Sequence, residues 1–144
     1  MKNNYSTKAQ IQKKAEIDDS TVSLDISIPQ TIDLKNYPFL LIIQSTTENH
    51  IRLTIYPIAR EKIIKIILAG QDISDEVIEI LSKILKKYEI IHSSGLLKKE
   101  KDFLYECYLN LSLSDAKSKD LKTSLDKIKN IFKEIKIEEI GLKN

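Results

Sequence analysis

The sequence predicts an α+β fold in which two helices cover one face of an antiparallel sheet, with about three further strands before it. Three observations carry this prediction. Isoleucine supplies much of the 42% apolar content, and its β-branched side chain suits a pleated surface. Two long segments repeat apolar residues at helical spacing, and shorter segments alternate or run apolar as strands do. Each helical segment is apolar along one stripe only, which indicates a sheet covered by helices on one side.

Composition narrows the class of protein. The 144 residues are enough for one domain, and 23 basic against 21 acidic residues leave a net charge of +2. A charge this balanced argues against nucleic acid or a membrane surface as partner. The single cysteine, Cys107, allows no internal disulfide, and no apolar run approaches the roughly 20 residues that span a bilayer. The first residues also lack the apolar core of a signal peptide, so we expect a cytoplasmic, soluble protein.

The start of the chain is polar. Residues 1–20 contain only Ile11 and Ile17 as large aliphatic side chains. This composition predicts a flexible N-terminal tail, with a short helix over residues 8–17.

Residues 21–60 predict a set of N-terminal strands. Residues 21–28 alternate apolar and polar side chains up to Pro29, as a half-buried strand does. Residues 39–43 are continuously apolar, which indicates a strand covered on both faces, and residues 51–56 alternate as the return strand of a hairpin. We expect these strands to extend the main sheet or to form a small subdomain.

From residue 62 the chain predicts a strand, a loop and a helix. Residues 62–69 are nearly all apolar, and Gly70 follows, where a positive φ would cost little. Ser74 has the hydroxyl of a helix N-cap, and two carboxylates after it favour the positive end of the helix dipole. The helix itself is expected from an apolar stripe, which consists of Val77, Leu81, Ile84 and Tyr88.

Two strands follow the first helix. Residues 89–97 predict a strand in which Gly95 permits a β-bulge. Residues 103–113 form the longest alternating run of the chain. We expect the apolar face that begins at Phe103 to pack under the helices, the opposite phase being the alternative.

The last segments complete a recognisable order. A second helix is expected from a stripe that consists of Leu121, Leu125, Ile128, Phe132 and Ile135, and residues 136–142 form a short strand. Residues 61–144 therefore have the order βαββαβ, the split βαβ of the ferredoxin-like arrangement. Right-handed crossovers place its first and third strands in the centre of the sheet. The other face of this sheet must meet solvent, a ligand, another chain or the N-terminal strands.

Residues 62–142 resemble an ACT-type regulatory domain. Domains of that family share the βαββαβ order and commonly carry a G-x-D motif between the first strand and the first helix, here Gly70, Gln71 and Asp72. Their first helix commonly leads through a short phrase ending in isoleucine into a strand, here residues 87–91. Where the family often has a second glycine in the loop, this chain has Ser74.

The resemblance implies a non-catalytic regulatory or sensor module. Such domains pair side by side as homodimers and bind a small effector, often an amino acid, near the first loop. The candidate ligand-binding residues are then Gly70, Gln71, Asp72, Ile73 and Ser74, with His92, Ser93 and Ser94 as a facing wall. Amides at the helix N-terminus can hold a carboxylate, and Asp72 can hold an ammonium group. The simpler interpretation is that Gly70 turns the chain while Asp72 or Ser74 caps the helix.

No pattern in the sequence indicates catalysis, a metal or a cofactor. His50, His92 and Cys107 are single residues without the paired spacing of metal ligands. Cys107 lies among apolar alternates, which indicates a buried, unreactive thiol rather than a nucleophile paired with His92.

Two other functions are alternatives. An RNA-recognition motif shares this topology and stacks bases on its third strand, and residues 101–108 match it at a lysine and at Phe103, Tyr105 and Tyr108. The match misses the small-residue positions, and the first strand lacks an aromatic partner. The second alternative is a protein–protein assembly module, in which residues 21–56 extend the sheet or pair with another chain.

Overall fold

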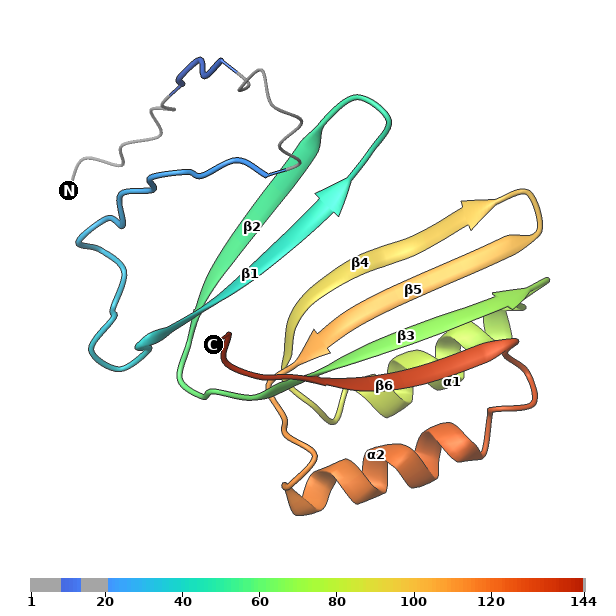
Figure 1. Cartoon of the computed structure of the whole chain (residues 1–144). Coiled ribbons are helices and arrows are strands. Elements are labelled where there is room, and N and C mark those ends of the chain that lie inside the picture. The colour runs from blue at the N-terminus through green and yellow to red at the C-terminus, as the bar shows by residue number, and fades with distance from the viewer. Residues whose placement is uncertain (1–8, 14–20, 144) are drawn as a thin grey trace. The chain divides into compact units, whose positions relative to one another are not determined.

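A computed structural model describes residues 9–13 and 21–143 of the chain. Contacts within the chain divide it into two units, Met1–Ile32 and Asp33–Asn144. All helices and strands of the described residues belong to the second unit (Figure 1).

The strand expected over residues 21–28 is not formed. Its apolar side chains alternate as predicted, but Val22, Leu24 and Ile26 are exposed and no strand ladder includes the segment. Alternation describes which side chains would share a face, whereas a strand also needs a neighbour for its backbone hydrogen bonds. The tail and short helix expected over residues 1–20 fall mostly outside the described residues, and residues 9–13 have no regular secondary structure.

The second unit contains a hairpin and a four-stranded sheet. The hairpin, expected from the sequence, consists of β1 (Phe39–Thr46) and β2 (Ile51–Ile58). The sheet is antiparallel with strand order β4-β5-β3-β6, so the first and third strands of the βαββαβ unit are central, as predicted. Its strands are β3 (Ile63–Gln71), β4 (Ile90–Lys99), β5 (Asp102–Leu109) and β6 (Glu134–Ile140). In Figure 1 both helices, α1 (Asp75–Leu85) and α2 (Ala116–Asp126), lie below this sheet.

The main core lies between the sheet and the helices. Along β3 the side chains of Ile64, Ile66 and Leu68 are fully buried on the helix side. Phe103 and Cys107 of β5 join them, so the predicted phase of that strand is confirmed. We call this cluster the helix-side core; its buried members are Ile64, Ile66, Leu68, Val77, Leu81, Leu85, Phe103, Cys107, Leu109, Leu111, Leu121, Leu125, Ile128 and Phe132.

The second helix is shorter than its apolar stripe predicts. α2 ends at Asp126, and turns carry the chain to β6 at Glu134. Ile128 and Phe132 are still buried in the helix-side core, although both lie in these turns, and Ile135 lies on β6. The apolar stripe therefore predicted correctly which side chains are buried, but a buried residue need not belong to a helix.

A short connection joins the hairpin to the sheet. Residues 59–62 separate β2 from β3, and Arg60 Nη1 lies 2.9 Å from Asp115 Oδ2 at the start of α2. The backbone amide of Ser112 and the guanidinium of Arg60 both hold the pKa of Asp115 below its ordinary value. The connection is thus anchored to the helical layer.

Candidate functional site

The predicted loop site serves the turn itself. Gly70 is the eighth residue of β3 rather than a loop residue, and its φ is not positive, so the expected reason for glycine was wrong. A Cβ at Gly70 would lie 3.0 Å from Ile73 Cδ1 and 3.6 Å from the backbone at Phe132. Only the first of these distances is tighter than an ordinary contact, so a side chain at residue 70 would require Ile73 to shift by a few tenths of an ångström. The positive φ, 52°, falls on Asp72, a residue type that tolerates the left-handed region.

The polar groups of this loop have structural partners. Gln71 Nε2 donates to Asp102 Oδ1 at 2.9 Å, and the Asp72 amide donates to the carbonyl oxygen of Lys101 at 3.2 Å. Ser74 is the N-cap of α1, as predicted, and its hydroxyl accepts a bond from the amide of Val77. Ile73 packs on the helix-side core. These contacts agree with the helix cap of the simpler interpretation, whereas the positive φ lies at Asp72 and not at Gly70.

The two halves of the predicted ligand site lie far apart. Gly70 pairs with Phe103 of β5, whereas His92 pairs with Tyr108 of the same strand. These two positions on β5 are separated by about 17 Å of extended strand. The structure therefore does not bring His92 against Asp72, and the facing wall is absent from the loop.

The segment around His92 forms the expected bulge. The register of β4 against β5 shifts between Ser93 and Leu96. The amide of Glu106 donates to Ser94 Oγ at 3.0 Å, and Ser93 shares a hydrogen bond with Tyr105. Both serines thus stabilise the irregular backbone of the bulge.

His92 instead links the sheet to the hairpin. The hydroxyl of Tyr56 on β2 and Nδ1 of His92 are hydrogen-bonded at 2.7 Å, and the two rings lie 5.5 Å apart. His92 also meets the ring of Tyr108 edge-on, with the ring centres 6.0 Å apart. Sequence reasoning missed this contact because Tyr56 was predicted only as the polar phase of a return strand.

A small apolar cluster lies under the hairpin. Its buried members, which we call the hairpin cluster, are Leu41, Ile43, Ile63 and Tyr108. The hairpin therefore covers part of the sheet face that the sequence left open. Beside the cluster, Lys65 Nζ lies 3.4 Å from Glu106 and 5.4 Å from the centre of the Tyr108 ring. Burial alone would lower the pKa of Lys65, but Tyr108 and Glu106 outweigh it and raise the pKa above its ordinary value.

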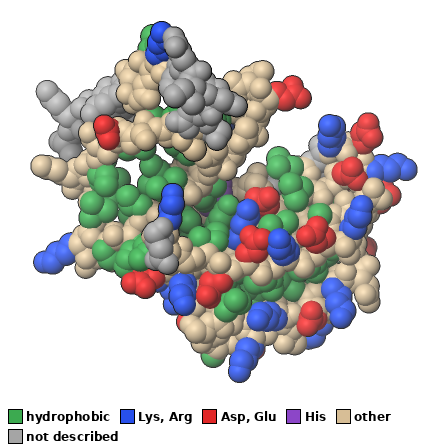
Figure 2. Space-filling model, viewed as in Figure 1, with side chains coloured by type: hydrophobic (Ala, Val, Ile, Leu, Met, Phe, Trp, Pro, Cys, Tyr) green, Lys and Arg blue, Asp and Glu red, His purple; other side chains and the backbone are tan. Residues whose placement is uncertain are grey.

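The opposite face of the hairpin is also apolar. Residues that face each other in an antiparallel pair share a face, so the partners of exposed β1 residues point outward with them. This outer face consists of Leu40, Ile42, Gln44, Thr46, Ile51, Leu53, Ile55 and Pro57. Ile42 and Ile51 are 59% and 61% exposed, and Leu40 and Leu53 are each 38% exposed. Figure 2 shows hydrophobic side chains exposed over the hairpin.

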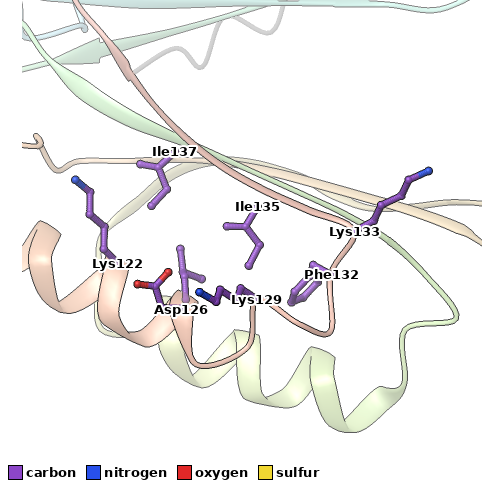
Figure 3. Close-up of a pocket in the computed structure, with 8 residues that line it drawn as sticks. Lys122, Asp126, Lys129, Phe132, Lys133, Ile135 and Ile137 are labelled. Carbon is purple, nitrogen blue, oxygen red and sulfur yellow. The ribbon is translucent and has the colours of Figure 1, made fainter.

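Among the hollows on the surface of the second unit, two adjoin β6. One, of about 390 Å³, lies between α2 and β6, with Phe132 and Ile135 on its floor and Lys122, Asp126 and Lys129 at its rim (Figure 3). The rim side chains Lys122, Asp126 and Lys129 are exposed. The other, of about 300 Å³, is a mostly apolar groove. It is lined by the first half of β1 and by residues 140–143.

The described residues offer neither a reactive thiol nor a cluster of side chains that could hold a metal ion. Burial raises the pKa of the Cys107 thiol to about 12, against the effect of its hydrogen bond with Tyr105. The thiol is therefore protonated and unreactive at neutral pH. Within residues 9–13 and 21–143, no cluster of three His, Cys, Asp or Glu side chains could hold a metal ion. No helix in the same part of the chain is long and apolar enough to cross a membrane.

Comparison with known proteins gives no relative for this chain: no protein-family model, curated protein or solved structure matches it. The geometry of the hairpin is therefore the main basis for a functional proposal.

Proposed function

We propose that this chain is a non-catalytic assembly module, in which a ferredoxin-like domain presents the β1–β2 hairpin to a protein partner. One observation carries the proposal: apolar side chains predominate on both faces of the hairpin, and only those of the inner face are buried within the second unit. Antiparallel sheets that meet water on one side normally have polar residues there. The outer face has two polar members, Gln44 and Thr46, and no charge.

The energetics of the outer face favour a partner. Burying a fully exposed isoleucine contributes about 1.5–3 kcal/mol, so Ile42 and Ile51 would each contribute about 1–2 kcal/mol. Charged residues are depleted in the centre of protein interfaces, and aliphatic and aromatic groups are retained there. The outer face fits that composition. The free backbone groups along the edges of β1 and β2 supply further contacts.

A protein partner fits the geometry better than a small effector. The loop residues Gln71, Asp72 and Ser74 are engaged in the turn and the cap, and His92 lies elsewhere on the sheet. The ACT-type resemblance supports a regulatory role in the same sense, because domains of that family act through assembly.

RNA binding has less support. Stacking on the third strand would need exposed rings, but Phe103 is only 4% exposed and belongs to the helix-side core. Tyr108 is buried under the hairpin, in contact with the cluster that includes Leu41. The aromatic side chains of β5 are thus occupied by the protein itself.

Affinity purification tests the proposal. The tagged chain and two charged double variants would be expressed in the cells from which the gene comes, and the retained proteins compared by mass spectrometry. Ile42→Asp with Ile51→Asp alters the outer face; Ile80→Asp with Ile131→Asp is the matched control, at apolar residues 42% and 43% exposed on the helical layer.

The expected result is that the hairpin variant loses a protein that the wild type and the control both retain. Thermal unfolding of each variant checks that the fold persists. Identical retention by all three chains, with the fold intact, would overturn the proposal.

A further inference from the structure

The two sheets of the second unit have four free strand edges, which belong to β1, β2, β4 and β6. A free edge exposes unpaired amide and carbonyl groups, and it is a template for another strand. Proteins commonly protect such edges with charged residues, proline or bulges. The four edges can therefore be compared by the protection that each one has.

Three of the edges are protected. β2 carries Arg52 and Pro57, and proline removes one amide from the edge. β4 has two shifts of register, between Ile90 and His92 and between Ser93 and Leu96, which disrupt a regular ladder. β6 has charge at more than half of its residues, namely Glu134, Lys136, Glu138 and Glu139.

β1 has none of these features. Its eight residues, FLLIIQST, include no charge, proline or glycine, and they pair with β2 without a shift of register. Among the described residues, no backbone hydrogen bond joins β1 to any segment other than β2. Beside its first half lies a groove, whose other lining residues include residues 140–143 of the same chain.

We propose that β1 pairs with β1 of a second copy of this chain, antiparallel across a two-fold axis, so that the hairpins form the sheet β2-β1-β1-β2. This inference rests on the proposed function, in which the hairpin makes the contact, and it places a second copy at the β1 edge, beside the outer face rather than on it. Such a pair is self-complementary, with the same strand on both sides of the axis.

Charge and pleat both suit a second copy. The strand has no charged residue, so self-pairing opposes no like charges in any register. A two-fold axis normal to the sheet keeps inner faces with inner faces, so Leu41 and Ile43 of both copies continue the same apolar layer. A charged strand from another protein would gain no ion pair at this edge.

The size of the contact predicts how tight the dimer is. Eight residues of antiparallel strand extend about 27 Å, which gives an interface well below the roughly 800 Å² per partner of standard stable complexes. Backbone hydrogen bonds and cross-strand pairs then hold a reversible dimer. We expect its population to depend on concentration in the micromolar to millimolar range.

Sedimentation velocity from about 10 μM to about 1 mM tests the dimer. Ile42→Lys places a charge on β1, at the proposed contact. Leu53→Lys is the matched control: it places the same charge on the same face, but on β2. The two β2 strands are the outermost strands of the proposed four-stranded sheet and do not meet. We expect the wild type and Leu53→Lys to dimerise with rising concentration. Ile42→Lys should weaken the dimer by at least about tenfold.

Cross-linking then distinguishes edge pairing from stacking of outer faces. Ile42→Cys or Leu53→Cys would be treated with a short bismaleimide, and the buried thiol of Cys107 should not react. Edge pairing predicts a cross-linked dimer from Ile42→Cys only, because the two β2 strands are three strand spacings, about 14 Å, apart. Equal cross-linking from Leu53→Cys would overturn edge pairing.

The outcomes also separate this inference from the proposed function. A monomer at every concentration overturns self-pairing even where the hairpin variants lose a different protein in affinity purification. If the chain is monomeric and no protein depends on the outer face, both proposals fail.

Discussion

The four-stranded sheet is covered by helices on one face and in part by the hairpin on the other, and these two coverings differ in depth and in chemistry. In the described residues, fourteen buried side chains form the helix-side core and four form the hairpin cluster. The buried members of the helix-side core are aliphatic, phenylalanine or cysteine side chains, whereas the hairpin cluster includes Tyr108 and lies beside the hydrogen bond between Tyr56 and His92.

This difference indicates separate roles for the two layers. Deep apolar burial contributes most of the free energy of folding, so the helix-side core sets the global stability. A layer held by few buried contacts and a solvent-accessible hydrogen bond opens at lower free energy than the whole protein unfolds. The hairpin is thus expected to be the layer that opens more easily.

The largest expected effect compares two neighbouring isoleucines of β3. Ile66 is fully buried on the helix side, whereas Ile67 faces the hairpin side and is partly exposed. We expect Ile66→Ala to lower the free energy of unfolding by about 3–4 kcal/mol and Ile67→Ala to lower it by about 1 kcal/mol. Urea denaturation followed by circular dichroism measures both. Equal losses would mean that the two layers contribute alike.

A pH titration isolates one group of the helix-side core. Because burial raises the pKa of Cys107 from 9.0 to about 12, the unfolded chain loses the thiol proton first. The contribution of the Cys107 thiol to the free energy of unfolding is therefore fully present below pH 9. It decreases by about 1.4 kcal/mol per pH unit as the pH rises towards 12. The difference in unfolding free energy between the wild type and Cys107→Ala should shrink over that window. Parallel profiles for the two chains would place the thiol in contact with water.

The smallest expected effect concerns the hairpin alone. Tyr56→Phe removes the hydrogen bond to His92, which contributes about 0.5–1.5 kcal/mol. We expect amide hydrogen exchange to accelerate by roughly threefold to tenfold in β1 and β2, with little change in β3 and β5. Uniform acceleration across all strands would show that the hairpin opens only with the whole fold.

The sequence predicted the helix side of the molecule well. Apolar alternation located β3 and β5, and the phase of Phe103 and Cys107 was confirmed. Ser74 was identified as a cap because its hydroxyl precedes an apolar stripe, and capping depends on residues close in sequence. Local patterns suffice for such elements.

The hairpin side depended on contacts that local patterns do not contain. The hydrogen bond between Tyr56 and His92 joins residues 36 positions apart, and nothing in either segment indicates the other. The reason for Gly70 was mistaken because its backbone conformation and its contact with Ile73 are properties of the folded loop. The loop residues were plausible ligands only while their structural partners were unknown.

The connection of residues 59–62, anchored by Arg60 to Asp115, limits how far the hairpin can travel. Four extended residues reach at most about 14 Å, so a detached hairpin swings on a short tether and remains near its own sheet. Its return is intramolecular, at an effective concentration in the millimolar range. Return of the inner face to its own sheet therefore competes strongly with binding of that face to another molecule. The outer face is accessible to solvent whether the hairpin is docked or detached.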